Sequence, residues 1–404
     1  MTKTVLVMPG SNMQVPLIKR IKEKGIRVLC IDPNKNAPAF RYADYCENSD
    51  ILAVNTCKEI AARYNVVAIV SDECDIAVRP IAEICDSLRL PSIGIDKAAL
   101  FTNKALMRSF CKENGFPSPN FKKCKTVSEA CAFYRALNNP KMIMKPVDSN
   151  SSRGVYTITS IEDISKFFDS SISFSKGEGS VICEEYIEGT EFTVDGIVVG
   201  GKHYSLCISK KKHYSHNANI AKELLFSHFD EKYDYGTLRK QNDLFVEKAQ
   251  LPFGFTHAEY KYNGKAFVLI EIGARGGGNF ISSHIVPWMT GIDNYEYLIT
   301  QSMGISLDEG ISIKDEYKER CSVLEFFDIA KENDRKQLKR ITGEDFLNDN
   351  SNIDMYHFNF NPGDQVFLPD DDSKRIGFYI AHAKNREILN GLMAEIKERV
   401  EFVF

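Results

Sequence analysis

The sequence predicts a chain of mixed α/β and α+β structure: an open α/β unit first, α+β subdomains in the middle, and a small α+β cap at the end. Up to about residue 97, short β-branched runs alternate with helical patterns. Further along, the apolar run from Phe267 to Ile270 follows the turn residues 262–265, which predicts a buried β-hairpin. From about residue 305 the pattern is mixed and closes with a helix from about Asn385 to Val400.

In the N-terminal unit we expect strands over Thr4–Met8, Val28–Ile31 and Val66–Val70. Asp32 ends the second strand, where a dinucleotide-binding fold places its ribose-binding acid, but the GxGxxG motif is absent, which argues against a nicotinamide cofactor. Three acids, Asp72, Glu73 and Asp75, follow the third strand at the sheet edge where α/β proteins bind ligands. They either hold substrate or cap the next helix.

The first domain boundary follows this unit. Residues 91–94 read as a short edge strand and turn, and residues 96–114 as a helix closed by Asn114-Gly115. Buried strands are then predicted over 142–145 and 155–159, with a polar, serine-rich loop over 147–153 between them. Serine and glycine let backbone amides approach a phosphate closely, although turns of this kind are common. Further strands are expected over 181–187 and 192–199, and a helix over 238–249.

Residues 202–222 differ from their surroundings because lysines and histidines dominate them. The three histidines His203, His213 and His216 raise the alternative of a zinc site. No acid or cysteine completes a spaced ligand set, so the sequence favours a solvated or mobile basic loop.

Composition excludes several classes of function. The chain has 404 residues and a formal net charge of −4, which offers no broad electrostatic footprint for nucleic acid or for an anionic membrane. The eleven cysteines are scattered and are expected to be reduced, mostly core thiols. Neither a signal peptide nor an uninterrupted apolar stretch is apparent, so we expect a cytoplasmic protein.

The hairpin carries the strongest chemical signal. Glu259 and Glu271 stand on its two strands and can share one face. Two converging carboxylates repel each other unless a cation lies between them, and Mg²⁺ accepts carboxylate and phosphate oxygens. Arg275 and a glycine run, Gly276 to Gly278, follow directly, an arrangement suited to metal-bound phosphate. The alternative, a surface hairpin with ordinary charges, fits less well because the flanking runs are so apolar.

Taken in order, these residues resemble the ATP-grasp superfamily, specifically the carboxylate-amine ligases that include bacterial L-amino-acid ligases, with an architecture like that of carbamoyl-phosphate synthase and biotin carboxylase. The resemblance implies a pre-ATP-grasp domain over 1–97, an ATP-grasp domain over 98–304 with a lid subdomain at about 120–187, and a C-terminal subdomain over 305–404. Related ligases are often homodimers, although no sequence feature here indicates one.

The resemblance also implies roles for individual residues. Lys104 and Lys145 would contact the phosphates of ATP, with the loop from Ser149 to Gly154, including Ser151 and Ser152, closing over them. Glu184, Glu185 and Ile187 would form the adenine-binding hinge, and Glu191 would accept the ribose hydroxyls. Glu259 and Glu271 would hold Mg²⁺, or Mn²⁺ in its place.

For catalysis, the resemblance implies that Arg275 stabilises the transferring phosphoryl group and the acyl phosphate, with Lys145 assisting. The alternative for Arg275 is a salt bridge with Glu271 alone. Gly276, Gly277 and Gly278 would bind a substrate carboxylate or the acyl phosphate. Ser283 and His284, with Ser282, would line the same pocket, although His284 also fits a core or capping role.

One position departs from the family pattern. The family usually has Asn two residues after the second metal-binding Glu, and this sequence has Gly273 there. Either water or substrate completes the metal coordination, or one Mg²⁺ alone is held firmly.

The implied activity is formation of an amide or peptide bond from a small carboxylate and an amine through an acyl phosphate, with ATP as phosphoryl donor. The first alternative keeps the fold but uses a phosphoribosyl amine or bicarbonate, as purine-biosynthetic and carboxylase-type members do. The second is a nucleotide-binding regulator without turnover, which only Gly273 supports.

Overall fold

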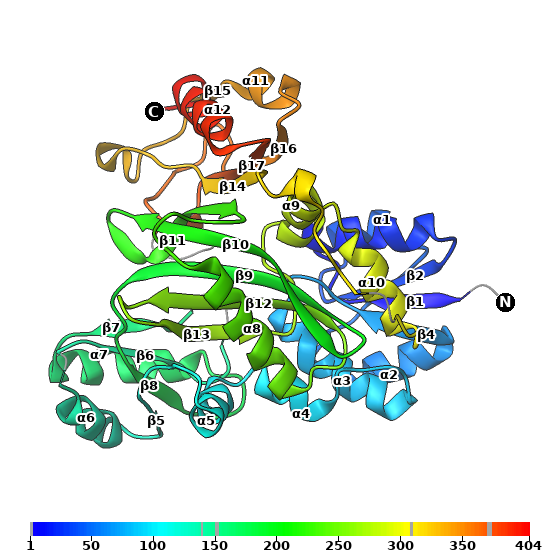
Figure 1. The fold of residues 1–404 in the computed structure, drawn as a ribbon, viewed down its shortest axis with the longest axis horizontal. Coiled ribbons are helices and arrows are strands. Elements are labelled where there is room, and N and C mark those ends of the chain that lie inside the picture. Colours follow the sequence, from blue (N-terminus) through cyan, green and yellow to red (C-terminus); the bar gives the residue numbers. More distant parts are fainter. Residues whose placement is uncertain (1–2, 139, 150–152, 308–309, 370–373) are drawn as a thin grey trace.

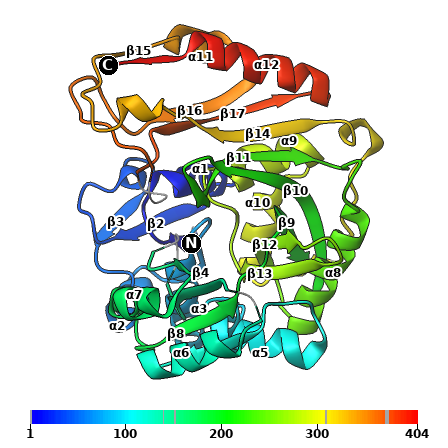
Figure 2. The same cartoon turned by 90° about the vertical axis from the view of Figure 1, so that its left-hand side faces the viewer.

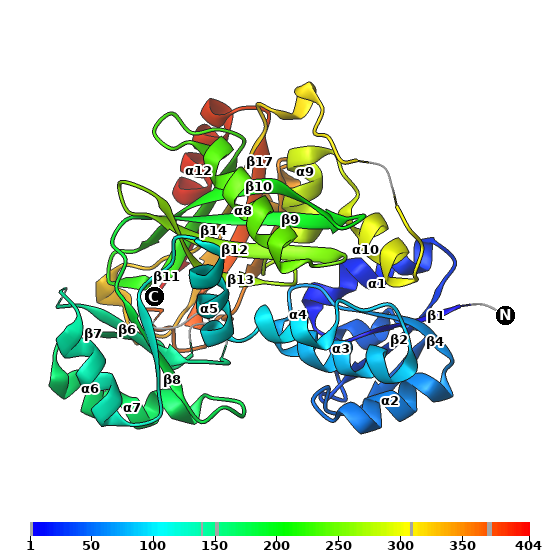
Figure 3. The ribbon, with the colours of Figure 1, turned by 60° about the horizontal axis from the view of Figure 1, so that its bottom comes forward.

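The computed structural model describes residues 3–138, 140–149, 153–307, 310–369 and 374–404. Within them the chain forms a four-stranded parallel sheet, an eight-stranded and a four-stranded antiparallel sheet, and a small two-stranded sheet (Figure 1). Figure 3 shows the first sheet at the lower right and the smaller antiparallel sheet at the lower left, with the large sheet above them. None of the helices in these residues combines the length and the apolar character needed to cross a membrane.

The N-terminal part is a four-stranded parallel sheet in the order β3-β2-β1-β4. Its elements are β1 (Thr4–Val7), η1 (Asn12–Gln14), α1 (Val15–Glu23), β2 (Arg27–Asp32), η2 (Pro38–Arg41), β3 (Tyr45–Asn48), α2 (Val54–Arg63), β4 (Val66–Val70) and α3 (Asp75–Leu88). The three predicted strands are confirmed. They read as apolar runs because helices cover both faces of a parallel sheet. The sequence did not reveal β3, since this edge strand is half exposed and carries no apolar run.

The predicted helix over 96–114 is two helices, α4 (Ile95–Leu100) and α5 (Lys104–Asn114). Asn103 interrupts them in an extended conformation, and its side chain accepts hydrogen bonds from the amides of Ala105 and Leu106. This N-cap makes Lys104 the first residue of α5. The predicted edge strand over 91–94 is wrong, because these described residues form no strand.

The smaller antiparallel sheet, called the lid sheet below, has the order β5-β8-β6-β7. Its strands are β5 (Phe121–Cys124), β6 (Met142–Pro146), β7 (Tyr156–Ile158) and β8 (Val181–Glu185). Two helices, α6 (Val127–Ala136) and α7 (Ile161–Ser173), lie between these strands in the chain. Both helices begin with capping boxes, Thr126 with Glu129 and Ser160 with Asp163. Apolar side chains of the helices and strands form one core.

The large sheet has eight strands in the order β13-β12-β9-β10-β11-β14-β17-β16. Its first five strands are β9 (Thr190–Val199), β10 (Lys202–Tyr214), β11 (Asn217–Ser227), β12 (Gly254–Tyr262) and β13 (Phe267–Gly273), and α8 (Tyr235–Ala249) packs against them. The expected mobile loop over 202–222 is therefore wrong. This basic segment forms β10 and the first half of β11, two central strands.

The last three strands of the same sheet come from the C-terminal segment: β14 (Cys321–Phe326), β16 (Ile353–Phe358) and β17 (Gly377–Ala383). Figure 2 shows them following β11, with α12 packed above. The predicted terminal helix is confirmed as α12 (Arg386–Arg399), whereas the strand expected near Gly363–Val366 is only an isolated bridge between Gln337 and Gln365. The domain limits at residues 97 and 304 stay a proposal.

Short elements complete the chain. Between β13 and β14 lie η3 (Ile281–Ile285), α9 (Val286–Thr290), α10 (Asn294–Ser302) and η4 (Asp315–Tyr317). The C-terminal segment adds η5 (Lys331–Asn333), α11 (Glu344–Asp349) and a two-stranded sheet of β15 (Arg340–Thr342) and β18 (Glu401–Val403). The eleven cysteines are free thiols, and all but Cys46 and Cys74 are buried.

Candidate active site

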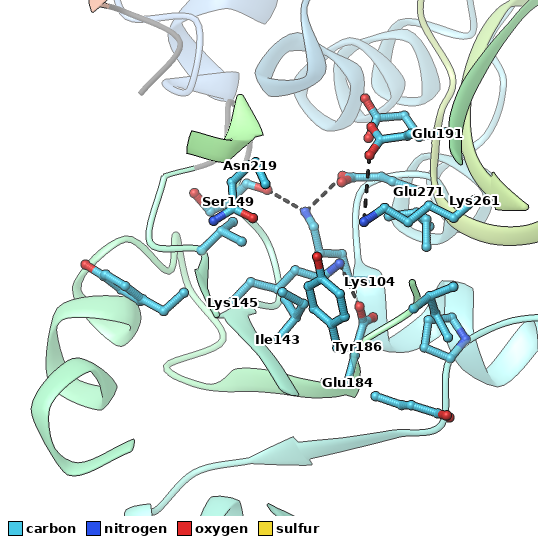
Figure 4. Close-up of a pocket in the computed structure, with 18 of the residues that line it drawn as sticks. Lys104, Ile143, Lys145, Ser149, Glu184, Tyr186, Glu191, Asn219, Lys261 and Glu271 are labelled. Carbon is cyan, nitrogen blue, oxygen red and sulfur yellow. Dashed lines mark hydrogen bonds and ion pairs between the residues drawn. The ribbon is translucent and has the colours of Figure 1, made fainter. Parts of the chain in front are cut away.

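A cavity of about 370 Å³ lies between the lid sheet and the large sheet (Figure 4). It is lined by many of the residues that the sequence singles out. These are Lys104, Lys145, Glu184, Glu185, Ile187, Glu191, Glu259 and Glu271. The N-terminus of α5, two lid strands and three strands of the large sheet thus bring basic and acidic side chains together from distant parts of the chain.

Glu259 and Glu271 stand directly opposite each other on β12 and β13, so both carboxylates lie on one face, as expected. Each is matched by a lysine. Lys104 Nζ lies 2.9 Å from Glu271 Oε1 and donates to the carbonyl of Ser149 at 2.6 Å. Lys211 Nζ lies 2.7 Å from both Glu259 Oε1 and Glu191 Oε1. The hairpin is therefore part of the cavity wall, and its two carboxylates, together with Glu191 of β9, face two ammonium groups.

These charges set the acidity of the buried groups. Burial alone would raise the pKa of Glu191, but Lys211, His213 and Lys261 outweigh it and hold the pKa well below the usual range. The pKa of Glu259 is also lowered, since Lys211 overcomes the effect of burial. Burial opposes the charge on Lys211, yet the two glutamates raise its pKa. All three side chains are therefore ionised at neutral pH.

On the lid side, Glu184 is held between two cations. It is only 3% exposed, Lys145 Nζ lies 2.8 Å from its Oε2, and Arg108 Nε lies 2.8 Å from its Oε1. Burial would raise the pKa of Glu184, but Arg108 and Lys145 lower it overall. Burial lowers the pKa of Lys145, with Glu184 opposing this shift.

Sequence reasoning missed Arg108. This fully buried residue of α5 also donates to the carbonyl of Ile270 on β13, and so ties α5 to both sheets. Its spacing of four residues from Lys104 places both on one helix face, a signal that could have identified it. Lys211 was missed because lysine runs are usually solvated.

The tip of the β10–β11 hairpin forms the roof of the cavity. Asn217, Ala218, Asn219 and Ile220 line it, and the Asn219 amide donates to Thr157 Oγ1 of the lid strand β7 at 3.5 Å. In Figure 4, Asn219 and Ser149 lie together above Lys145, and Glu191 faces Lys261. The large sheet and the lid sheet therefore enclose the cavity jointly.

Within the serine-rich loop, Ser151 and Ser152 lie outside the described residues. Gly154 is buried with a φ of +73°. A Cβ at this position would stand 2.9 Å from Phe174 Cδ2 and 3.0 Å from Pro146 Cγ, so both conformation and packing require glycine here. Gly154 does not line the cavity itself.

Arg275 lies outside the cavity lining and pairs with the N-terminal part of the chain. Its Nε lies 3.0 Å from Asp75 Oδ1 and its Nη2 lies 2.9 Å from Asp75 Oδ2. The alternative of a salt bridge with Glu271 alone is therefore wrong. Burial would lower the pKa of Arg275, but Asp75 raises it, so the guanidinium stays charged.

This ion pair also accounts for Gly273. A Cβ on Gly273 would stand 3.0 Å from Asp75 Oδ1 and 3.4 Å from Arg275 Nε. An asparagine side chain would have to displace the pair. The carboxylate of Asp75 thus lies next to the position that carries an asparagine in the family pattern.

The other two acids of the N-terminal part also contact residues that follow β13. Asp72 accepts hydrogen bonds from Ser282 Oγ and Tyr295 Oη at 3.1 and 2.8 Å, and Glu73 Oε2 accepts from the amide of Phe280 at 3.0 Å. Neither caps α3, whose N-cap is Cys74 without a side-chain hydrogen bond.

The structure separates the remaining predicted residues from the cavity. Ser283 and His284 line another cavity of about 560 Å³, together with Lys19 and Arg20 of α1. Gly276 and Gly277 pack against Asp72 and Asp195, while Gly278 faces open space.

The zinc alternative fails on geometry. The ring of His203 lies between Asp243 and Thr256, His213 lies 3.4 Å from Glu191, and His216 bonds to the carbonyl of Pro369. Within the described ranges no group of three or more metal-ligand side chains gathers. Asp32 accepts from the amides of Gly10 and Asn34 and so holds its own loop.

Comparison with known proteins agrees with this geometry. Residues 102–219 match the sequence model of the family described as phosphoribosylglycinamide synthetase, ATP-grasp (A) domain. Dapdiamide A synthase of Enterobacter agglomerans is 24% identical over 198 residues, 48% of this chain and 47% of that protein. A formate-dependent phosphoribosylglycinamide formyltransferase of Trichormus variabilis is 26% identical over 169 residues, 40% of this chain and 42% of the other. The chain thus spans less than half the length of these curated relatives.

Solved structures resemble the whole chain. The L-amino acid ligase from Bacillus licheniformis superposes with a TM-score of 0.83 at 16% identity, covering 100% of this chain and 99% of the other. The biotin carboxylase from Campylobacter jejuni gives a TM-score of 0.74 at 17% identity, covering 100% and 92%. These likenesses establish the fold. Residues 102–219 thus match an ATP-grasp domain model, and the whole chain shares the fold of these solved structures.

Proposed function

We propose that the protein is an ATP- and Mg²⁺-dependent ligase that joins a small carboxylate to an amine through an acyl phosphate. One observation carries the proposal: Lys104 and Lys145 line the same cavity as the carboxylates of Glu259 and Glu271. Such a site fits a nucleoside triphosphate with its metal ion. The lysines can bind phosphate oxygens, and the glutamates can bind a hard cation. The similarity to ligases of this fold supports the same reading.

Nucleotide binding would exchange the ion pairs of the cavity. Lys104 and Lys145 would move from Glu271 and Glu184 toward the phosphates. Glu184 to Ile187 would lie along the adenine and Glu191 at the ribose, in keeping with their places in the lining. Arg108 would keep Glu184 neutralised during this exchange, since it holds the second carboxylate oxygen.

Two carboxylate side chains on one face form a donor set that fits Mg²⁺, and Glu259 and Glu271 would hold it. When bound, the ion would neutralise charge on the transferring phosphoryl group. Arg275 would act next to it, with Asp75 fixing the orientation of its guanidinium. Residues 217–220, which form the roof of the cavity, would keep water from the acyl phosphate.

A second candidate keeps the fold and changes the substrate. The formyltransferase relative acts, by its name, on a phosphoribosylglycinamide, which favours a phosphoribosyl substrate. The cavity that Lys19 and Arg20 line offers cationic side chains for a phosphate, but Arg20 is already paired with Asp293 and Glu296. We therefore favour an amino acid or another small carboxylate.

The decisive experiment measures Mg²⁺-dependent ADP release from ATP over a panel of single amino acids and amino-acid pairs, with product masses recorded. We expect one pair to stimulate release and to give a product lighter by one water than the sum of its parts. Stimulation by a phosphoribosyl amine instead would support the second candidate. ATP binding without stimulated release by any carboxylate or amine would contradict both and favour a nucleotide-binding regulator.

A further inference from the structure

Residues 275–280, called the glycine turn below, are surrounded by carboxylates. Asp75 pairs with Arg275, and Asp72 Oδ1 lies 2.2 Å from where a Cβ of Gly276 would stand. Asp195 Oδ1 lies 2.5 Å from the corresponding point on Gly277, and Glu73 accepts from the amide of Phe280. Four acids thus contact a turn whose own charged side chain is Arg275 alone.

Two oxygens of these acids are buried without a hydrogen-bond partner among the described residues: Glu73 Oε1 and Asp195 Oδ2. Asp195 is 3% exposed, and its other oxygen lies 2.8 Å from His257 Nδ1. An unpaired buried carboxylate oxygen is costly because it has lost water and gained nothing. Since Asp75 already takes the guanidinium of Arg275, these oxygens call for another cation.

The raised pKa values of Asp72 and Glu73 agree with a shortage of positive charge around these carboxyl groups. Burial raises the pKa of Asp72 to about 6, although Tyr295 and Ser282 donate to it. Burial, with the charges of Asp72 and Asp195, raises the pKa of Glu73 well above its ordinary value, against the opposing effect of Arg275. A cationic ligand would relieve this repulsion.

The position of Asp195 relates the cluster to the proposed reaction. Cα pairing across the sheet gives two adjacent rows, one of Thr193, Glu259 and Glu271 and one of Asp195, His257 and Gly273. Residues two apart on a strand share a face, so Asp195 stands about 7 Å along the strands from the proposed metal ligands. A substrate bound there would lie beside the transferring phosphoryl group.

Space for part of such a substrate lies next to Cys74 and Arg275. Gly278 has nothing within 4 Å of the point where a Cβ would stand. A cavity of about 70 Å³ is lined by Ser71, Cys74 and Arg275 and otherwise mainly by apolar side chains such as Val78, Phe255 and Leu298. Its size suits a short aliphatic group.

The backbone here is held in an unusual conformation. Glu73, Asn279 and Phe280 have backbone φ values of 55°, 59° and 65°, which residues other than glycine rarely adopt. The hydrogen bond from Phe280 to Glu73 joins two of them. Surrounding contacts must fix this geometry, as is common where a ligand is positioned.

We propose that Glu73 and Asp195 bind the ammonium group of an amino-acid substrate with a short apolar side chain. An ammonium has three donors, which match two orphaned carboxylate oxygens with one donor left over. The inference rests on the proposed ligase function and names its substrate class. The ammonium belongs either to the acyl donor or to the attacking amine, and in the second case it must first give a proton to one of the two carboxylates before it can attack. The experiment separates the two cases.

The test uses Glu73→Gln and Asp195→Asn, which keep side-chain size, with Asp86→Asn on the exposed face of α3 as the matched control. Hydroxylamine traps the acyl phosphate as a hydroxamate without needing an amine site. If the acyl donor carries the ammonium, the preference for alanine over propionate in hydroxamate formation should fall at least about tenfold in both variants. Activity on propionate itself should persist.

If the attacking amine carries the ammonium, hydroxamate formation should stay unchanged, and peptide formation should require at least about tenfold more amine. An unchanged preference together with an unchanged amine dependence in both variants would overturn the inference. A parent protein that forms neither hydroxamate nor peptide from any carboxylate would instead refute the proposed ligase function.

A binding readout stands beside activity. In the presence of ATP, alanine should raise the thermal midpoint of the parent and control proteins more than propionate does, and both variants should lose this difference. Persistence of the difference would count against the site. Stabilisation by Mg²⁺ alone that disappears in Glu73→Gln would also overturn the inference, because the acids would then be a metal site. If one variant fails to show the ATP-induced shift of a folded protein, the other carries the test.

Discussion

Asp75 and Arg275 are 200 positions apart in the sequence, yet the carboxylate of the first spans two nitrogens of the second, at 3.0 and 2.9 Å. Asp75 begins α3, next to the parallel sheet, and Arg275 follows β13 of the large sheet. A planar guanidinium held at two points keeps one orientation. The N-terminal part of the chain thus sets the direction of the arginine proposed to act on the phosphoryl group.

Asp75→Asn should lower kcat by about tenfold to a hundredfold while the KM for ATP changes little, because a displaced guanidinium costs catalysis more than nucleotide binding. Steady-state kinetics in ATP would measure this. Asp86→Asn on the same helix should behave as the parent protein. A rise in the KM for ATP without any loss of kcat would contradict a positioning role.

Arg275→Ala should lower kcat by about a thousandfold and leave ATP affinity nearly unchanged, since the charge it stabilises develops during transfer. Single-turnover ADP formation and equilibrium nucleotide titration separate the two quantities. Equal activity in variant and parent would remove Arg275 from the reaction.

Glu271→Ala should weaken the affinities for Mg²⁺ and for nucleotide together, with at least about tenfold more Mg²⁺ needed for half-maximal activity. A Mg²⁺ titration of ADP release measures the shift. The same change at Glu247, an exposed residue of α8, provides the control. An unaltered titration curve would remove Glu271 from the metal site.

Lys211→Met should destabilise the fold by about 3 kcal/mol, because Glu191 and Glu259 would lose the cation between them. The variant should also gain more thermal stability from Mg²⁺ than the parent gains, since the bared carboxylates attract a cation. Melting with and without Mg²⁺ measures both effects, with exposed Lys248→Met as control. Equal Mg²⁺ stabilisation in all three proteins would refute this account.

The acid sensitivity of the fold should depend on Glu184. Its pKa is lowered from 4.5 in the folded protein, chiefly because Arg108 and Lys145 overcome burial. The ion pairs therefore stabilise the fold fully above about pH 4.5, and their contribution is lost as the pH falls through the folded pKa. Glu184→Gln should be less stable than the parent at pH 7 and lose less stability between pH 7 and pH 4. Urea unfolding at both pH values measures the free energy of unfolding. An equal loss of stability in the variant and the parent would show that Glu184 does not cause the acid sensitivity.

Local patterns predicted the elements near the cavity but not their long-range partners. The turn at 262–265 and the apolar run before Glu271 were sufficient to place Glu259 and Glu271 on one face. Nothing close to Arg275 in the sequence indicates Asp75, because that contact depends on how two separate sheets pack. The roles of the lining residues stay predictions.

The basic segment shows why a local pattern fails. Residues 202–214 combine lysines with apolar side chains, and a strand covered on both faces has no clean alternation to reveal it. Lys211 finds its partners Glu191 on the neighbouring strand β9 and Glu259 on β12, one strand further away. Its partners come from pairing that the sequence of β10 alone cannot indicate.

The strand β11 reaches the cavity roof at one end, and it pairs with β14 from Glu223 to Phe226 at the other. The cavity roof is therefore not a free loop. It is the end of a strand whose other end is held in the large sheet by β14 of the C-terminal segment. If the proposed function holds, substitutions among these C-terminal residues would shift the cavity roof and change how long nucleotide stays bound. Variation in this segment would then adjust the proposed activity without touching the residues that line the cavity.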